Sequence, residues 1–370
     1  MSDAATPTSE SASTAGPERS RIEGGGGFFA RYPLVRYVLI RFGVSIILLW
    51  GVTLVTFVFT NLVPSNPALA ALGDRAASDP EVVAQFNHEY GLDRPVWVQY
   101  GVYVWHLLHG NLGMSTQTHQ PVASDLSTVF PATAELAIVA VIIAAVLGVL
   151  LGLYAALRQR SFVDQLIRVL SLIGVSTPTF WMAMVIYFAL FYKLNLFPGS
   201  GRLDPALVPP PHVTGFYTID ALLAGESHVF VNAVQHLVLP SSVLVIYNVG
   251  YLARFTRSSV LDVLGNDYVT TARAKGLPAR TVTGRYILRG AFVPILTIVG
   301  ISFGGVLSGA VLTETVFSWG GLGQYAYKAS TTLDLQAVMG VGLVVGVVFI
   351  AVNFIVDLLY GFIDPRVRVG

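Results

Sequence analysis

The sequence predicts an all-α polytopic membrane protein with six transmembrane helices, and three observations lead to this fold class. Hydrophobic residues make up 54% of the 370 residues and charged residues only 12%, about half of the roughly 25% charge of soluble domains. The mean hydropathy of +0.66 indicates that lipid forms part of the solvent of this chain. The third observation is a series of six charge-free apolar runs.

The composition also excludes several classes of function. A net charge of +1 argues against a nucleic-acid partner. The chain contains no cysteine, which excludes disulfides, thiolate metal sites and a cysteine nucleophile. Its seven histidines lack the spacing typical of a metal site. We therefore expect surface or interfacial histidines rather than metal ligands, and no cofactor.

The chain opens with a segment unlike the rest. Residues 1–35 are rich in Ser, Thr, Ala, Pro and Gly and include Gly24 to Gly27. Such a segment has too little apolar area to offset the entropy lost on ordering. We expect a disordered cytoplasmic tail, with a regulatory tail as the alternative.

Each apolar run approaches the ~20 helical residues that cross a hydrocarbon core of about 30 Å. The runs do not alternate as barrel strands do, and the first is too long and too far from Met1 for a signal peptide. The predicted spans are residues 42–63, 136–157, 169–192, 237–253, 291–313 and 335–356.

These spans divide the chain. We expect the first transmembrane helix within 36–63, a large external loop over 64–135, and a core with five transmembrane helices over 136–370. The aromatic residues between Val96 and His109 favour a short interfacial helix in the external loop. A long cytoplasmic loop over 262–290 separates the fourth and fifth spans.

The basic residues set the orientation, because cytoplasmic loops carry an excess of Lys and Arg. If both termini lie in the cytoplasm, only five of the 22 Lys and Arg residues face the outside: Arg75, Arg94, Lys193, Arg202 and Lys328. The sequence therefore predicts that both termini are cytoplasmic.

The most informative segment lies in the long cytoplasmic loop, where residues 266–280 read NDYVTTARAKGLPAR. The pattern indicates a helix, a break and a second helix. Asn266 or Asp267 suits the N-cap of the first helix, and Gly276 suits the left-handed position after it. Pro278 suits the first turn of the second helix.

This segment is predicted to dock a partner. Its small residues allow the backbone of another protein to approach, and Arg273 and Lys275 can pair with acidic groups there. The alternative is an ordinary basic loop that satisfies the excess of positive charge in the cytoplasm.

The segment resembles the inner-membrane permeases of ATP-binding-cassette importers, and most of all the B-type subunit of the dipeptide/oligopeptide/nickel family. The peptide-importer pattern Asp-Tyr-x-x-Thr-Ala-Arg-Ala-Lys-Gly-Leu matches at Asp267, Tyr268 and 271–277. The leading Glu of the general importer signature is absent, and its downstream proline is displaced, with Pro294 the nearest counterpart. Both departures favour the peptide-importer subfamily.

Further motifs extend the resemblance over nearly the whole chain from about residue 36. They occur in the family's order, as GLDRP at 91–95, GNLG at 110–113, STPTFW at 176–181, ETVFSWGGLG at 314–323 and DPRVR at 364–368. The tail before them has no counterpart in the family.

The resemblance implies a division of labour in the cytoplasmic (inner) membrane. This chain would form the pore with a second, homologous permease, while two cytoplasmic ATP-binding cassette subunits hydrolyse ATP and an extracytoplasmic substrate-binding protein delivers substrate. The sequence lacks the Gly-x-x-x-x-Gly-Lys-Ser/Thr phosphate loop, so it is not expected to be an enzyme or to hold catalytic residues. The expected contacts with the ATPases are Tyr268, Thr271, Ala272, Arg273, Ala274, Lys275 and Gly276.

Polar residues in or beside the spans are candidates for the pore or its gate, with helix packing or a position at the span boundary as the alternative. The candidates are Glu135, Ser176, Thr177, Asn248 and Glu314. Glu135 and Glu314 end two spans on the outer side, where they would give an acidic mouth suited to a substrate ammonium group.

Other functions remain as alternatives to import of di- and oligopeptides. A same-family importer of nickel chelate or haem stays open. A proton-coupled secondary transporter would place an ionisable relay at the membrane midplane, and no run contains one. An intramembrane hydrolase would need a Ser/Lys pair or a His-Glu-x-x-His helix; His88-Glu89 is not followed by the second histidine.

Overall fold

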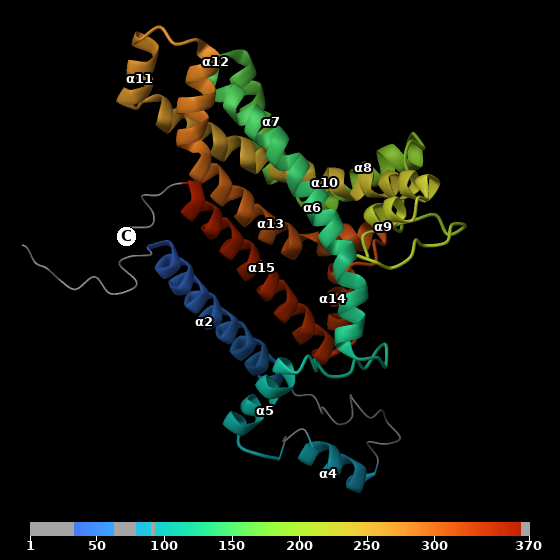
Figure 1. Ribbon diagram of the computed structural model, residues 1–370. Helices are drawn as coiled ribbons and strands as arrows, with labels where there is room; N and C mark the ends of the chain where they lie inside the picture. Colours follow the sequence, from blue (N-terminus) through green and yellow to red (C-terminus); the bar gives the residue numbers. More distant parts are fainter. Residues whose placement is uncertain (1–32, 63–78, 90–92, 364–370) are drawn as a thin grey trace, which may run out of the picture.

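The computed structural model describes residues 33–62, 79–89 and 93–363. Helices dominate these ranges (Figure 1), and their one β pairing is an isolated bridge between Met114 and Pro121. The N-terminal segment predicted to be disordered lies almost wholly outside the described residues. The helices are α2 (Pro33–Leu62), α4 (Pro80–Glu89), α5 (Val96–Leu108), α6 (Val122–Leu157), α7 (Phe162–Ser176), α8 (Thr179–Ile186), the π-helix η1 (Tyr187–Lys193), α9 (Tyr217–Leu223), α10 (Ser227–Leu264), α11 (Asp267–Ala274), α12 (Ala279–Thr281), the π-helix η2 (Val282–Leu288), α13 (Arg289–Phe317), α14 (Leu322–Thr331) and α15 (Leu335–Ile363).

Five of these helical segments are long and apolar enough to cross a membrane: α2, α6, α10, the continuous α12–η2–α13 and α15. A sixth crossing is complete if α7 and the helix that follows it count as one bent span. Each of the six predicted runs therefore lies on helical segments, apart from a break at 177–178 in the third run and from Val63, which lies outside the described residues. The helices extend beyond the runs; α6, for example, begins at Val122 rather than Leu136, because its polar first turns project past the apolar part.

The structure differs from the sequence prediction at the third run, which is not one straight helix. α7 ends at Ser176, α8 begins at Thr179, and the two are bent by 102°. Thr177 has an extended backbone with ψ of 126°, the conformation that a following proline imposes. Pro178 therefore interrupts the span.

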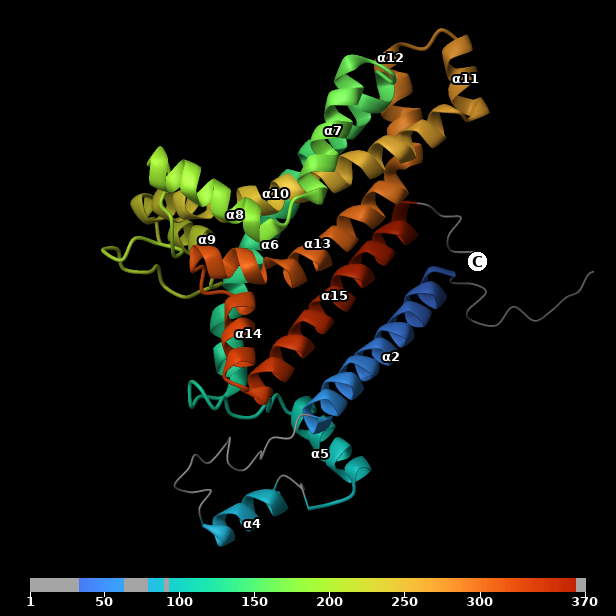
Figure 2. The same ribbon diagram turned by 180° about the vertical axis from the view of Figure 1, so that it is seen from behind.

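The helices form an elongated assembly with different elements at its two ends. α11 and α12 lie at one end and α4 and α5 at the other, with the long helices between them (Figures 1 and 2). α2 lies beside α15, and α15 also contacts α13. A helix is present where the sequence predicts a short interfacial one, as α5; its position at the membrane interface stays a prediction.

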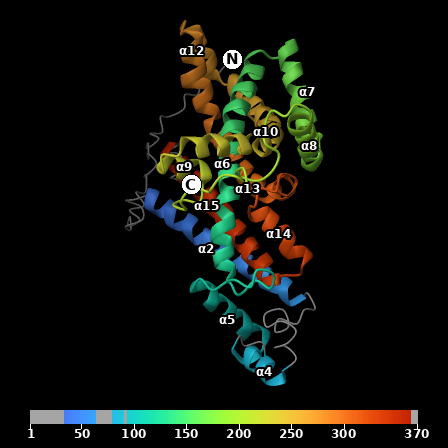
Figure 3. The same ribbon diagram turned by 90° about the vertical axis from the view of Figure 1, so that its right-hand side faces the viewer.

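α6 and α10 form the centre of the fold, crossing each other as the views in Figures 1 and 3 show. Glycines permit the close approach: a Cβ atom on Gly152 would lie 2.5 Å from the carbonyl oxygen of Ala253. The main apolar core then forms between α6, α10 and α13, with Leu136, Leu244 and Leu307 buried together. Trp319, which follows α13, closes this core.

Candidate functional site

The segment between α10 and α13 folds as the sequence predicts, into a helix, a turn and a second helix. Gly276 has a φ of +72°, the left-handed conformation that favours glycine after a helix. Its amide donates to the carbonyl of Arg273 (2.9 Å), and the amide of Leu277 donates to that of Ala272 (3.4 Å). The capping prediction is wrong in one respect: Asn266 occupies the N-cap, but its side chain makes no capping hydrogen bond.

The inner face of α11 is held by an apolar group that we call the anchor cluster. Val269 is fully buried and Ala272 is 3% exposed. They pack with buried residues of the neighbouring helices, so α11 is attached to several long elements at once. The anchor cluster consists of Ala156, Val260, Val263, Val269, Ala272, Val282, Ile287 and Ala291.

A second contact joins α11 to the start of α13. A Cβ atom on Gly290 would lie 2.5 Å from the hydroxyl oxygen of Tyr268, so that hydroxyl rests directly over the glycine backbone. Tyr268 is nevertheless 44% exposed. Its ring is thus available to a partner while its tip touches α13.

The outer face of α11 is polar, basic and open. Thr271, Arg273, Ala274 and Lys275 are all exposed. Within the described ranges neither Arg273 nor Lys275 forms an ion pair. The structure therefore separates the predicted coupling residues: Ala272 faces the anchor cluster, and its neighbours face outward.

A buried ion pair fixes α7 to α10, and sequence reasoning missed it. Asp164, fully buried, accepts from Nε and Nη2 of Arg257 at 2.7 and 2.9 Å and from the Arg160 amide at 3.0 Å. Asp164 is positioned because Ser161 caps α7 by accepting the amide of Asp164. The Ser-x-x-Asp spacing at 161–164 was a visible sign of the helix start, but nothing in the sequence pointed to Arg257, 93 residues away.

Glu135 lies inside the protein, where it ties α6 to the segment before α10. It is 3% exposed, accepts from Nη2 of Arg202 at 2.7 Å and accepts the amide and hydroxyl of Thr218 at 2.9 and 2.6 Å. The Arg202 guanidinium also stacks over the ring of Tyr217, 3.7 Å from its centroid. All these contacts are made within the chain itself.

Glu314 is also enclosed. It has no exposed surface and accepts from the Thr133 hydroxyl at 2.6 Å and from the Gln324 amide at 3.0 Å. Nearby, Nε1 of Trp319 donates to the carbonyl of Ala132 at 2.8 Å. The two glutamates predicted at an acidic mouth thus both hold the ends of helices within this chain.

The remaining pore candidates occupy different settings. Ser176 is exposed and Thr177 half-buried at the break between α7 and α8, and the Thr177 hydroxyl donates to Ile173 in the preceding turn. Asn248 is buried in α10 and donates its amide to the carbonyl of Leu244 at 2.8 Å. The structure does not gather the five candidates into one cluster.

Residues 194–226, between η1 and α10, form a cap held by two aspartates. We call it the external cap, after the side of the membrane on which the sequence predicts it. Asp220 accepts the amides of Thr214 (2.8 Å) and Gly215 (2.8 Å). Burial acts to raise the pKa of this carboxyl, but the hydrogen bonds outweigh it and hold the pKa below its ordinary value. The Asn232 amide likewise lowers the pKa of Asp204, which also contacts the His236 ring at 3.2 Å.

Comparison with known proteins accounts for this architecture. Residues 148–369 match the family described as "Binding-protein-dependent transport system inner membrane component". Residues 34–137 match the N-terminal part of such membrane components. The chain belongs to this family of transport permeases. It is therefore a multi-pass protein of the cytoplasmic membrane and the permease subunit of an ATP-binding-cassette importer.

Curated relatives match over nearly their whole length. The "Probable D,D-dipeptide transport system permease protein DdpB" of Escherichia coli K12 is 44% identical over 86% of this chain and 94% of its own. The "Dipeptide transport system permease protein DppB" of the same strain is 41% identical over 90% and 99%. The "Di/tripeptide transport system permease protein DppB" of Pseudomonas aeruginosa UCBPP-PA14 is 42% identical over 90% and 99%.

Proposed function

We propose that this permease subunit carries di- and oligopeptides into the cell, forms half of the translocation pore and couples to cytoplasmic ATPases through α11. The names of its relatives support peptides as the cargo. The geometry of α11 supports the coupling role: Val269 and Ala272 attach the helix to the fold, while Arg273 and its neighbours are exposed. This division between an anchored and an open face is the observation that carries the proposal.

The proposed orientation places α11 in the cytoplasm and both termini with it. The segment from α11 to the start of α13 contains Arg273, Lys275, Arg280, Arg285 and Arg289, an excess of positive charge that is typical of a cytoplasmic face. The proposed assembly comprises this chain, a second homologous permease, two ATP-binding cassette subunits and an extracytoplasmic substrate-binding protein, all acting within a lipid bilayer.

The proposed mechanism is alternating access. ATP binding closes the two ATPases on each other, and each holds the coupling helix of one permease. Because the anchor cluster joins α11 to α6, α10, η2 and α13, a displacement of α11 displaces these helices together. ATP supplies the differential affinity for the two states that such a shift requires, and hydrolysis restores the first state.

Within the membrane, we propose that the break between α7 and α8 borders the substrate path. Ser176 is exposed at this break, and Pro178 leaves nearby backbone groups without the hydrogen bonds of a continuous helix. Such irregular backbone occurs at membrane depth where it lines a cavity or is buried in protein. Glu135 and Glu314 would instead keep the external cap and α14 in place.

The test is reconstitution of the complete transporter in vesicles. Peptides are expected to stimulate ATP hydrolysis and to accumulate only with ATP, whereas nickel chelates and haem in parallel assays would have no effect. Reversing the exposed charges at Arg273 and Lys275 with Arg273→Glu and Lys275→Glu should lower uptake. Lys328→Glu is the control, because Lys328 is exposed on α14, which follows the other end of α13. Accumulation by this chain alone without nucleotide would contradict the proposal.

A further inference from the structure

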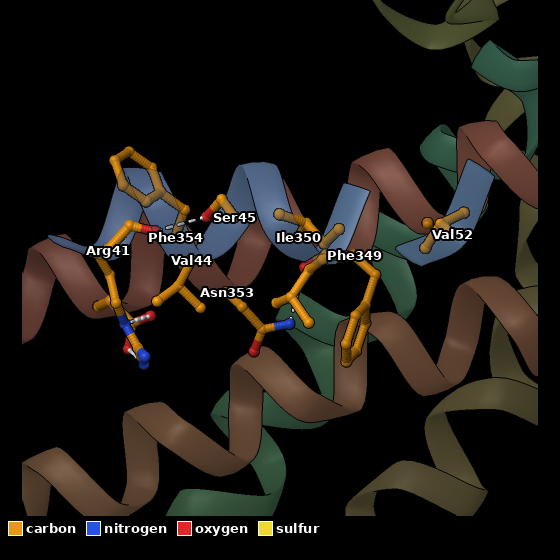
Figure 4. A pocket seen from close by; sticks show the side chains of 11 residues that line it. Arg41, Val44, Ser45, Val52, Phe349, Ile350, Asn353 and Phe354 are labelled. Carbon is orange, nitrogen blue, oxygen red and sulfur yellow. Dashed lines mark hydrogen bonds and ion pairs between the residues drawn. The ribbon is translucent and has the colours of Figure 1, made fainter. Parts of the chain in front are cut away.

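A groove of about 430 Å³ runs between α2 and α15 (Figure 4). α2 contributes one wall, with Arg41, Val44, Ser45, Leu48 and Val52, and α15 contributes the other from Gly346 to Asp357. The residues that line this groove take no part in the contacts described above for α11, the external cap or the break between α7 and α8. Both helices are long and apolar enough to cross a membrane.

The cytoplasmic-side end of the groove is charged. Arg41 and Asp357 bridge the two helices, with Nε and Nη2 of the guanidinium 2.5 and 2.6 Å from the two carboxylate oxygens. The Arg41 side chain remains 43% exposed. Since a guanidinium has five N–H donors and this pairing uses two nitrogens, donors remain for a second anion.

The opposite end is apolar and closed. A Cβ atom on Gly346 would lie 2.9 Å from Cγ1 of Val52, so the two helices touch there. Between the ends, the polar side chains are satisfied within their own helices: the Ser45 hydroxyl donates to the Arg41 carbonyl and the Asn353 amide to the Phe349 carbonyl. The middle of the groove thus offers apolar surface, including Leu48, which is 53% exposed.

The dimensions match one chain of a lipid. Arg41 to Val52 rises about 16 Å along α2 at ~1.5 Å per residue, which is about half of a hydrocarbon core of ~30 Å. A helix of another protein is ~10 Å wide and does not fit between two helices in contact at Gly346. The groove therefore has the length of one leaflet, and the ion pair at its end, with guanidinium donors to spare, lies at the depth of the headgroups.

We propose that this groove binds a phospholipid of the cytoplasmic leaflet, with one acyl chain lying between α2 and α15 and the phosphate on Arg41. The assignment to that leaflet rests on the proposed orientation, but the binding itself does not depend on transport or on peptide as the cargo. The bound chain would fill the space between α2, which has few other neighbours, and the rest of the bundle.

Native mass spectrometry of the assembled transporter tests the proposal. Val44→Trp fills the groove while leaving both charged residues in place, and it is expected to remove one bound phospholipid per copy of this chain. Ile46→Trp is the matched control, because Ile46 is 51% exposed and lies about 200° around α2 from Val44. Equal lipid content in the wild type and Val44→Trp, or equal loss in both variants, would overturn the proposal.

Two further experiments identify the occupant. The double variant Arg41→Gln/Asp357→Asn removes both charges together and should weaken lipid retention several-fold; unchanged retention would overturn the assignment of the phosphate to Arg41. A phospholipid with a photoactivatable acyl chain should cross-link to α2 and α15. Because the chain contains no cysteine, Ser45→Cys provides a unique thiol, and its cross-linking to another permease instead of lipid would refute the proposed occupant.

Discussion

Gly276 shows how much one backbone conformation can decide. Its φ of +72° reverses the chain after α11, yet no atom lies within 4 Å of the position that a Cβ would take. A substitution there would not disturb packing. Its whole effect would come from the left-handed conformation, which costs a residue with a Cβ about 1–2 kcal/mol.

Replacement of Gly276 by Val is therefore expected to uncouple ATP hydrolysis from uptake without loss of membrane insertion. Gly276→Asn should retain most coupling, because Asn tolerates the left-handed region. Gly225→Val is the matched control, since Gly225 has a φ of +74° and equally open surroundings far from α11. Transport and ATPase rates in reconstituted vesicles check this, and wild-type uptake by Gly276→Val would contradict the role of the turn.

The ion pair of Asp164 and Arg257 gives a second prediction for single residues. Asp164 is fully buried, and loss of one partner of a buried pair costs about 3–5 kcal/mol when no other charge compensates. Arg168, whose Nε lies 3.6 Å from Asp164, remains in the Arg257 variant and keeps the expected cost at or below the lower end of this range. Arg257→Gln is expected to destabilise the protein strongly, and Asp164→Asn combined with Arg257→Gln to recover part of the loss. Thermal unfolding in detergent measures both; equal stability of the single and double variants would indicate that the pair is not coupled.

At the scale of elements, the broken third span is the feature that sequence periodicity did not reveal. The apolar run 169–192 has the composition of a continuous helix, but Thr177 is extended and the two halves meet at 102°. The hydrophobicity of the run indicates that both halves are buried in lipid or protein. The angle between the two halves depends instead on one residue, Pro178. The π-helix η1 continues α8 to Lys193.

Pro178→Ala restores an amide donor and is expected to straighten this element. The chain has no cysteine, so spin labels can be placed uniquely at Phe162→Cys and Tyr192→Cys, which replace side chains that are 78% and 69% exposed. The distance between the labels should increase in Pro178→Ala. An unchanged distance would mean that packing around Met182 and Ala183, and not the proline, maintains the bend.

At the scale of the whole molecule, the external cap is a unit held by carboxylates. Asp220 and Asp204 have pKa values below their ordinary value of 3.8. When the pKa of a carboxyl is lower in the folded than in the unfolded state, its ionised form stabilises the folded state. This stabilisation is complete above the ordinary pKa and is lost as the pH falls through the pKa of the folded state. The cap should therefore loosen only in strong acid.

Hydrogen exchange of residues 204–220 checks this expectation. Protection should be constant from neutral pH to about 4, near the ordinary pKa of a carboxyl, and should fall below it, while the membrane helices remain protected. Asp220→Asn replaces one carboxylate oxygen by an NH2 group, which cannot accept a hydrogen bond. This variant should loosen the cap already at neutral pH. Loss of protection well above pH 4 would require another titrating group.

The sequence was sufficient for the parts of the molecule that depend on local pattern. The six runs lie on helical segments apart from the break in the third, and the Gly276 turn and the short helix α5 are where residue type predicts them. The sequence pattern did not predict contacts between residues that are far apart in the chain. Glu135 was predicted at an acidic mouth, since its partner Arg202, 67 residues later, lies on an irregular segment whose path no periodicity specifies.

The anchor cluster has one more consequence, for the number of shapes that the permease can adopt. Its buried side chains come from α6, α10, α11, η2 and α13, and close-packed interiors shift between discrete arrangements rather than deforming smoothly. A displacement of α11 therefore cannot be accommodated by the bending of one neighbouring helix alone. Under the proposed mechanism, we therefore expect α6, α10, η2 and α13 to move together, so that the permease changes between inward-open and outward-open forms in a single step.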